Sequence, residues 1–215
     1  MYPPRRAHQL SFGAGANKIS ALPYTITAPG TYELTSNLTS LVAGNAITIN
    51  VPVAGAVVLN LNGFTINWNQ NMGAGGGTNG IGILYTTSSQ SVITIKNGSI
   101  GTLDQGFWTG IAVNGNPPNG SNENYLANLT IDNVTFAAER WSDVSLNQVN
   151  SATGSNCTFL GLFPQSAVQY GIQDTGSQGG NRYVNDSFDG GQTNMIAVDN
   201  NGPAVLTRAE FAPAN

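Results

Sequence analysis

The sequence predicts an all-β fold, a parallel β-solenoid of about six to seven coils. Three observations predict it. A short pattern recurs six times along the chain, at spacings of 34, 36, 23, 29 and 23 residues. Its apolar residues alternate with Thr, Ser and Asn, which is the period of a strand and not of a helix. Only 8% of residues are charged and 27 are glycine, a composition typical of strands and turns.

The recurring pattern ends on an apolar residue, which we call the anchor. Its six copies are LNGFTI, IKNGSI, IDNVTF, GSNCTF, YVNDSF and LTRAEF. Each coil of a parallel solenoid adds one strand to each sheet, so residues at equivalent places lie directly above one another. We therefore expect the anchors to form one inward stack: Ile66, Ile100, Phe136, Phe159, Phe188 and Phe211.

A second apolar column precedes each anchor by 15 to 25 residues. Short runs such as ITI and IAV mark it, and they read as strands of a second sheet. Each coil is thus expected to hold one strand, a connection, another strand, a tight corner and the anchor. The second column begins at Ile47, Ile81, Ile111, Val144, Ile172 and Ile196.

The predicted corner lies three residues before each anchor. Asn97, Asn133, Asn156 and Asn185 occupy it in four coils, and Gly63 occupies it in an earlier one. Asn tolerates the left-handed backbone that a sharp corner requires, and stacked amides can hydrogen-bond between coils. The four Asn residues also match the N-glycosylation acceptor. We interpret them as corners, because the repeat explains them without a glycan.

Composition excludes several classes of function. Seven Lys and Arg residues, with a net charge of −4, cannot form the basic surface of a protein that neutralises nucleic-acid phosphates. No apolar run approaches the roughly 18 residues of a membrane span. A single Cys and a single His exclude an internal disulfide and a histidine cluster for zinc. We expect no metal and no cofactor.

The chain divides into two predicted parts. Residues 1–22 are expected to form an N-terminal arm that docks on another subunit or on a larger particle. Residues 23–215 are expected to form the solenoid. The end coils of a solenoid expose strand edges, which need a cap or a neighbour.

Two stretches carry a family resemblance: PYTITAPGTYELTSNLT (23–39) and NAITINVPVAGAVVLNLNGFTI (45–66). Together with Gly80-Ile81 and Gly110-Ile111, they resemble the opening coils of right-handed parallel β-helix proteins of the pectin-lyase-like superfamily. The resemblance covers about residues 23–211, and it implies a right-handed β-helix. It leaves the activity open, because this fold carries lyases, hydrolases, epimerases, phage tailspikes, adhesins and inert rods.

The resemblance implies that an enzyme would carry carboxylates or a base on an outer face. The Asn-Thr-Asp, Asp-Asp, Gly-His-Gly and Arg-Ile-Lys motifs of polygalacturonases are absent. Asp189 and Glu210 are nevertheless expected to face outward on neighbouring coils, with Arg182 or Arg208 nearby. Such a group is a candidate for acid–base chemistry. Surface ion pairing is the interpretation that we favour for these residues.

Tryptophan supplies a binding hypothesis. Trp68, Trp108 and Trp141 follow anchors by two, eight and five residues, at the same part of each coil. Exposed rings there can stack on sugars, or they can cover the flank of the core or a subunit contact.

Two further residues are expected inside the core. Cys157 reads as a small buried hydrophobe, and Asp186 must find hydrogen-bond donors or shift its pKa.

Two functional hypotheses follow. The first is a non-enzymatic fibre, spike or filament subunit, outside the cell or on a virion surface, that self-associates and contacts carbohydrate. The absence of an apolar stretch of signal-peptide type after the initial Met favours a virion part within this hypothesis. The second is a polysaccharide lyase, hydrolase or epimerase that uses the acidic and basic side chains of the last coils.

Overall fold

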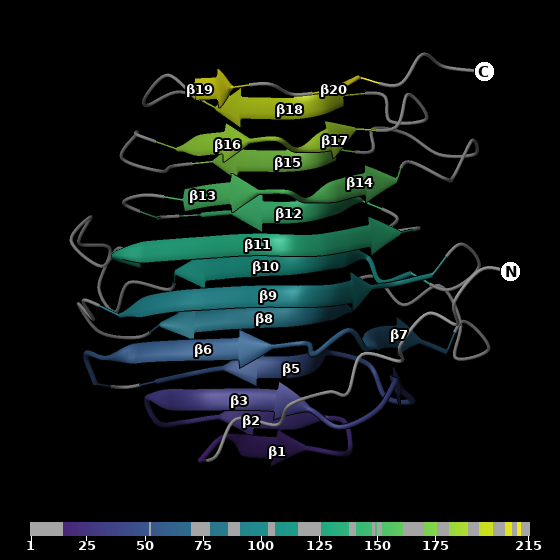
Figure 1. Ribbon diagram of the computed structural model, residues 1–215, viewed down its shortest axis with the longest axis vertical. Helices are drawn as coiled ribbons and strands as arrows, with labels where there is room; N and C mark the ends of the chain where they lie inside the picture. The colour runs from purple at the N-terminus through teal and green to yellow at the C-terminus, as the bar shows by residue number, and fades with distance from the viewer. Residues whose placement is uncertain are drawn as a thin grey trace, which may run out of the picture.

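The structure is a computed structural model. It describes residues 15–51, 53–69, 78–85, 91–102, 106–115, 126–137, 141–147, 149, 152–160, 170–175, 181–188, 194–199, 205–207 and 210–211. Within these ranges the chain forms strands and turns and no helix, and hence no helix that could span a membrane. The strands stack from the N-terminal to the C-terminal end in chain order (Figure 1).

Two parallel sheets make up the stack. Sheet B has seven strands in the order β18-β15-β12-β10-β8-β5-β2. In chain order these are β2 (Tyr24–Ile26), β5 (Asn45–Ile49), β8 (Asn79–Tyr85), β10 (Thr109–Gly115), β12 (Ser142–Leu146), β15 (Tyr170–Thr175) and β18 (Asn194–Asp199).

Sheet A has thirteen strands. The long strands β9 and β11 pair with one set of strands in their first half and with another set in their second half. Its strands are β1 (Asn17–Ile19), β3 (Gly30–Leu34), β4 (Leu38–Ser40), β6 (Ala56–Asn60), β7 (Thr65–Trp68), β9 (Val92–Ile100), β11 (Asn128–Ala137), β13 (Ala152–Ser155), β14 (Thr158–Leu160), β16 (Arg182–Val184), β17 (Ser187–Phe188), β19 (Val205–Thr207) and β20 (Glu210–Phe211).

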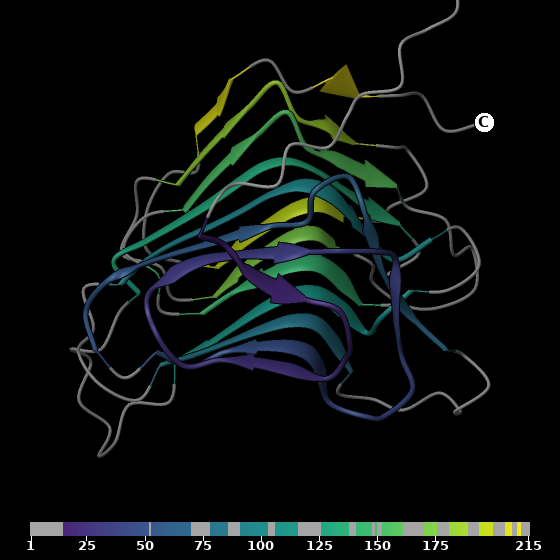
Figure 2. The same ribbon diagram turned by 60° about the horizontal axis from the view of Figure 1, so that its bottom comes forward.

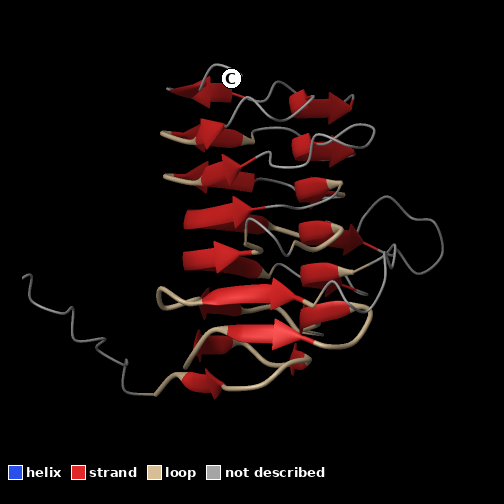
Figure 3. Ribbon diagram, turned by 90° about the vertical axis from the view of Figure 1, so that its right-hand side faces the viewer, coloured by secondary structure: helices blue, strands red, loops and turns tan. Residues whose placement is uncertain are grey.

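The register of both sheets confirms the two predicted columns. In sheet A the anchors pair in sequence from Ile66 to Phe211. In sheet B the second column pairs in sequence from Ile47 to Ile196. The result is an all-β, parallel arrangement that is consistent with a β-solenoid. Successive strands lie one above another along the stack, which Figure 3 shows from the side.

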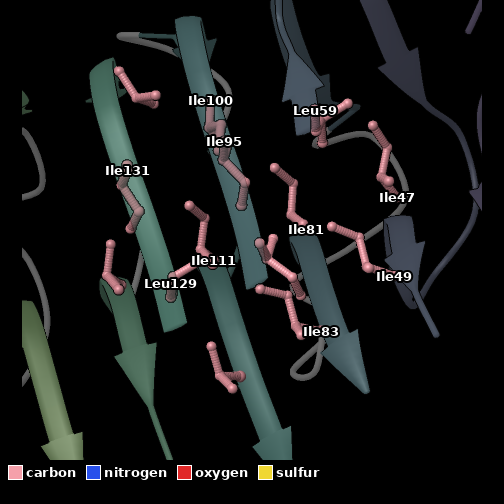
Figure 4. Packing of buried hydrophobic residues seen from close by; sticks show 14 of the residues in the cluster. Ile47, Ile49, Leu59, Ile81, Ile83, Ile95, Ile100, Ile111, Leu129 and Ile131 are labelled. Atoms are coloured by element: carbon pink, nitrogen blue, oxygen red, sulfur yellow. The ribbon is translucent and has the colours of Figure 1, made fainter. Parts of the chain in front are cut away.

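The core lies between sheets A and B, which face each other in Figure 2. The column residues whose side chains are described are almost fully buried in it, as Ile81 and Ile100 illustrate. Side chains from both sheets meet there: Ile47, Ile81 and Ile111 point toward the residues of β6, β9 and β11 (Figure 4). Burying one such side chain contributes about 1.5–3 kcal/mol. The apolar columns are therefore the main source of stability in this part of the stack.

The predicted corners are also confirmed. Asn97, Asn133, Asn156 and Asn185 have φ between 55° and 59°, in the left-handed region that Asn tolerates better than most residues. The Asn133 side-chain amide donates to Asn97 Oδ1 at 3.2 Å, as predicted for stacked corners. The Asn156 amide instead donates to Asp132 Oδ1 at 3.0 Å.

The earliest predicted corner differs from the others. Four residues separate Asn60 from Thr65, whereas two separate their partners Lys96 and Ser99 on β9. The longer corner uses two left-handed positions, at Asn62 (φ 57°) and Gly63 (φ 78°). The Asn62 N–H donates to Asn60 Oδ1 at 3.0 Å, which closes this turn locally.

Sheet A begins inside the segment that the sequence predicts as an arm. Strand β1 pairs with β3, so that Asn17 lies opposite Tyr32 and Ile19 opposite Leu34. Ile19 is fully buried in the core. Residues 1–14 lie outside the described residues, and the prediction that they dock on a partner stays a prediction.

Candidate functional site

Three aromatic residues form a continuous strip on sheet B. Trp108 and Trp141 directly precede β10 and β12, and Tyr170 begins β15. The Trp141 N–H donates to Trp108 O at 2.8 Å, and the Tyr170 N–H donates to Trp141 O at 2.9 Å. The parallel ladder therefore fixes the spacing of these residues. We call Trp108, Trp141 and Tyr170 the aromatic strip.

The rings of the aromatic strip contact one another. The indoles of Trp108 and Trp141 are nearly parallel, with centroids 5.9 Å apart and planes 5° apart. Tyr170 meets Trp141 edge to face at 6.0 Å. Aromatic contacts of this kind contribute about 0.5–1.5 kcal/mol beyond their burial. All three side chains are partly exposed, so the strip is both preorganised and accessible.

A hydrogen bond holds the central ring of the strip. Trp141 Nε1 donates to Gln173 Oε1 at 3.1 Å. Gln173 lies on β15 in register with Ser145, three positions along the strand from Tyr170. The indole of Trp141 thus extends across the outer face of sheet B, and its polar N–H is satisfied while part of its surface stays open.

Trp68 does not join this strip. It lies on β7 of sheet A, is only 5% exposed, and packs against Phe107 with ring centroids 6.3 Å apart. A buried ring offers no face to a sugar, so the predicted group of three tryptophans is corrected here. Trp108 and Trp141 come together as expected, and the third member is Tyr170, which the sequence reasoning did not select.

A row of polar side chains lies beside the strip on sheet B, with Asn45 and Asn79 partly exposed and Thr109 and Ser142 buried. Asn79 Nδ2 donates to Asn45 Oδ1 at 2.8 Å, and Ser142 Oγ donates to Thr109 Oγ1 at 3.4 Å. These four residues are in register on neighbouring strands. A second row runs in register through Gly82, Ala112 and Ser145 to Gln173, and Ser145 and Gln173 are its partly exposed members.

The predicted acid–base group is only partly described. Asp189 and Arg208 lie outside the described residues. Glu210 lies on β20, opposite Ser187 of β17. Arg182 lies on β16, exposed, between Thr153 and Val205 in register. The structure therefore does not test whether these four side chains meet, and the acid–base site stays a prediction.

Five acidic side chains are described, and most of them are buried. Glu33, Asp143, Asp174 and Asp186 are at most 4% exposed, and Asp132 is partly exposed. Glu33 pairs with Lys18, and Asp174 accepts from Asn181 Nδ2. Among the described residues, no group of three metal-ligating side chains comes together.

Asp186 behaves as the inward position predicts. It is 1% exposed, and its Oδ1 accepts the Cys157 N–H at 2.7 Å. Its Oδ2 is buried without a hydrogen-bond partner. Burial raises the pKa of Asp186 to about 6, against the opposing effect of the hydrogen bonds from Cys157.

Cys157 is buried, as predicted, at 1% exposure. Burial, followed by the negative charge of Asp186, raises the pKa of its thiol to about 12. A thiol with such a pKa forms almost no thiolate near neutral pH, and thiolate is the reactive form. Cys157 is thus a core residue and not a nucleophile.

The sequence reasoning missed a charged column on sheet A. It runs in register through Lys18, Glu33, Asn60, Lys96, Asp132 and Ser155. Opposite charges alternate along it, and Ser155 Oγ donates to Asp132 Oδ1 at 2.7 Å. Lys96, Asp132 and Ser155 all stand four residues before an anchor, so aligning that position would have revealed this part of the column.

Comparison with protein-family models, with curated proteins and with solved structures finds no match for this chain. The parallel β architecture is therefore established by the structure alone, and membership of the pectin-lyase-like superfamily stays a prediction.

Proposed function

We propose that this chain is a non-enzymatic structural and recognition protein of an extracellular or virion surface. In this proposal a rigid β-solenoid displays the aromatic strip to a carbohydrate partner. The observation that carries the proposal is the contact of the partly exposed rings of Trp108, Trp141 and Tyr170 along three neighbouring strands of sheet B.

The rigidity of the strip supports a recognition role. Each ring belongs to a strand, or to the residue before one, and backbone hydrogen bonds tie these residues to their neighbours. A ligand that binds such a surface immobilises few new side chains, so little of the contact energy is lost to ordering. Trp and Tyr each combine an apolar ring with one polar group, which suits a binding surface that is apolar in part and also contacts water.

The placement of the described acids supports a binding role over hydrolysis. A glycoside hydrolase needs two carboxyl groups facing one open groove, about 5–10 Å apart. Of the five acids whose side chains are described, only Asp132 is partly exposed, and it accepts hydrogen bonds from Ser155 and Asn156. Cleavage by the candidates Asp189, Glu210, Arg182 and Arg208 remains the competing hypothesis.

Two finer points of architecture belong to the same proposal. We infer that the stack winds as a right-handed β-helix of about six to seven coils. The seven strands of sheet B, each separated from the next by strands of sheet A, support this. We also infer self-association. Strands β2 and β18 end sheet B, and an unpaired edge attracts another chain unless something covers it.

The test is a binding and cleavage screen. Purified protein is passed over immobilised neutral and acidic polysaccharides, and its mass in solution is measured by light scattering over a concentration series. We expect retention on at least one polysaccharide and weaker retention of Trp141→Ala, with Thr94→Ala on sheet A as the control. New reducing ends or unsaturated products, abolished by Asp189→Asn or Glu210→Gln, would replace the proposal with an enzyme.

A further inference from the structure

The described charges are distributed unequally between the two outer faces. Every described charged side chain that is not buried lies on sheet A: Lys18, Lys96, Asp132 and Arg182. The charged side chains described on sheet B are Asp143 and Asp174, and both are buried. The described outer face of sheet B, which carries the aromatic strip, is therefore uncharged.

The exposed members of the two rows beside the strip offer only neutral hydrogen-bonding groups. Asn45 and Asn79 are partly exposed in one row, in which Thr109 and Ser142 are buried, and Ser145 and Gln173 are partly exposed in the other. Amides and hydroxyls can both donate and accept. They match the hydroxyl groups of a sugar, whereas a carboxylate or sulfate would meet no opposite charge on these rows.

The strip itself suits an uncharged ring. The face of an indole is negative, so it attracts the slightly positive C–H groups on one face of a sugar ring. An anionic sugar placed there would lose hydration without gaining a countercharge, which is costly. The three rings belong to consecutive strands of sheet B. A polymer that runs along the stack meets all three, and one that crosses the stack meets a single ring.

We propose that the ligand of the aromatic strip is a neutral polysaccharide that lies parallel to the axis of the stack, over Trp108, Trp141 and Tyr170. This inference rests on the proposed recognition function and specifies its substrate class and orientation. It predicts that binding depends little on ionic strength and that longer oligosaccharides bind better until they span the strip.

The first experiment is calorimetry with soluble glucan, xylan and mannan oligosaccharides, and with polygalacturonate and alginate as anionic probes. We expect a neutral oligosaccharide to bind with an affinity that changes less than about twofold between about 50 mM and about 500 mM salt. Replacing Trp141 by Ala should weaken binding roughly 3- to 10-fold. Trp141→Phe should retain part of the affinity and guards against loss of folding.

Charge variants make the test sharper. Ser145→Lys places a cation beside the strip and should create salt-sensitive binding of polygalacturonate, while the matched variant Thr94→Lys on sheet A should not. Glu139 and Arg140 precede Trp141 and lie outside the described residues. The double variant Glu139→Gln with Arg140→Gln should leave binding of the neutral ligand unchanged.

The outcomes separate this inference from the function on which it rests. Salt-sensitive binding of an anionic polymer by the unmodified protein, weakened by Trp141→Ala, would overturn the neutral ligand and leave the recognition function standing. Affinity that does not increase with oligosaccharide length would overturn the axial orientation. Absence of binding to every probe, or unchanged binding by Trp141→Ala, would overturn both proposals.

Discussion

The interior of the stack changes in character between its early and its late coils. In sheet B one inward position is occupied by Ile49, Ile83, Val113 and Leu146 on successive strands, and then by Asp174 on β15. The early part of the core is hydrocarbon, whereas the late part includes polar and acidic groups. The same fold is thus stabilised differently at its two ends.

A similar change occurs in sheet A. The inward residues Leu59, Ile95 and Ile131 are followed by Gly154 and then by Tyr183. Tyr183 is 4% exposed, and its Oη, like Asp186 Oδ2, is buried without a hydrogen-bond partner. An unsatisfied buried polar group costs about 1–3 kcal/mol. At these positions the late coils therefore depend on hydrogen bonding and on protonation in addition to hydrophobic burial.

The largest expected effect comes from moving an acid into the early type of core. Leu146→Asp places a carboxyl group one coil before Asp174, where the same position is otherwise apolar. We expect a loss of more than about 3 kcal/mol in the free energy of unfolding, from lost burial and an unpaired polar group. Urea unfolding followed by circular dichroism measures it. Leu146→Met is the control, and a similar loss in both variants would contradict the comparison.

Gly154 tests how closely the late core is packed. A Cβ at this position would lie 2.7 Å from Tyr183 Cδ1 and 2.8 Å from Asp186 Oδ2. Overpacking of this kind costs about 1–3 kcal/mol, so Gly154→Ala should be destabilising. In a double-mutant cycle with Tyr183→Leu, part of the cost should disappear. Strict additivity of the two changes would show that the ring is not the obstacle.

Asp186 should give the late coils a characteristic pH dependence. Its pKa of about 6 in the folded protein exceeds the ordinary value of 3.8, so the folded state holds the proton more tightly than the unfolded chain. The stabilisation from this group is fully present below pH 3.8. It falls as the pH rises from 3.8 to about 6 and is lost above about pH 6. The free energy of unfolding then decreases by on the order of 2 kcal/mol.

The measurement is the difference in unfolding free energy between the natural protein and Asp186→Asn at several pH values. The asparagine cannot titrate, so this difference should shift against the natural protein as the pH rises from about 4 to about 6. Asp132→Asn, at a partly exposed acid, is the matched control. A difference that is flat, or of opposite sign, would show that Asp186 is paired and charged in the folded state.

The smallest effect is kinetic. Cys157 is 1% exposed and its thiol pKa is about 12, so a thiol reagent should modify it only when the late coils open. Labelling should therefore accelerate in Gly154→Ala and remain slow in variants of the early core that are destabilised to the same degree. Rapid stoichiometric labelling of the natural protein would contradict the buried position.

Much of the fold could be predicted from the sequence because of its topology. In a parallel stack the neighbour in space is the equivalent residue of the next repeat, so a column found by alignment becomes a column in the sheet. The register of the anchors, from Ile66 to Phe211, follows directly. The left-handed corner at Asn133 follows as well, because Asn is one of the few residues that accepts that conformation.

Only the tertiary structure decided the candidate site. Trp68 and Trp108 both follow anchors closely in sequence, yet one ring is buried beside Phe107 and the other stacks on Trp141. The distance from an anchor does not determine which sheet a loop residue joins, because the connections differ in length between coils. Tyr170 belongs to the strip because it packs against Trp141, which its distance from an anchor does not predict either. Periodicity specifies the residues that face the core, while the direction of a side chain outside the repeat depends on the neighbours that pack against it.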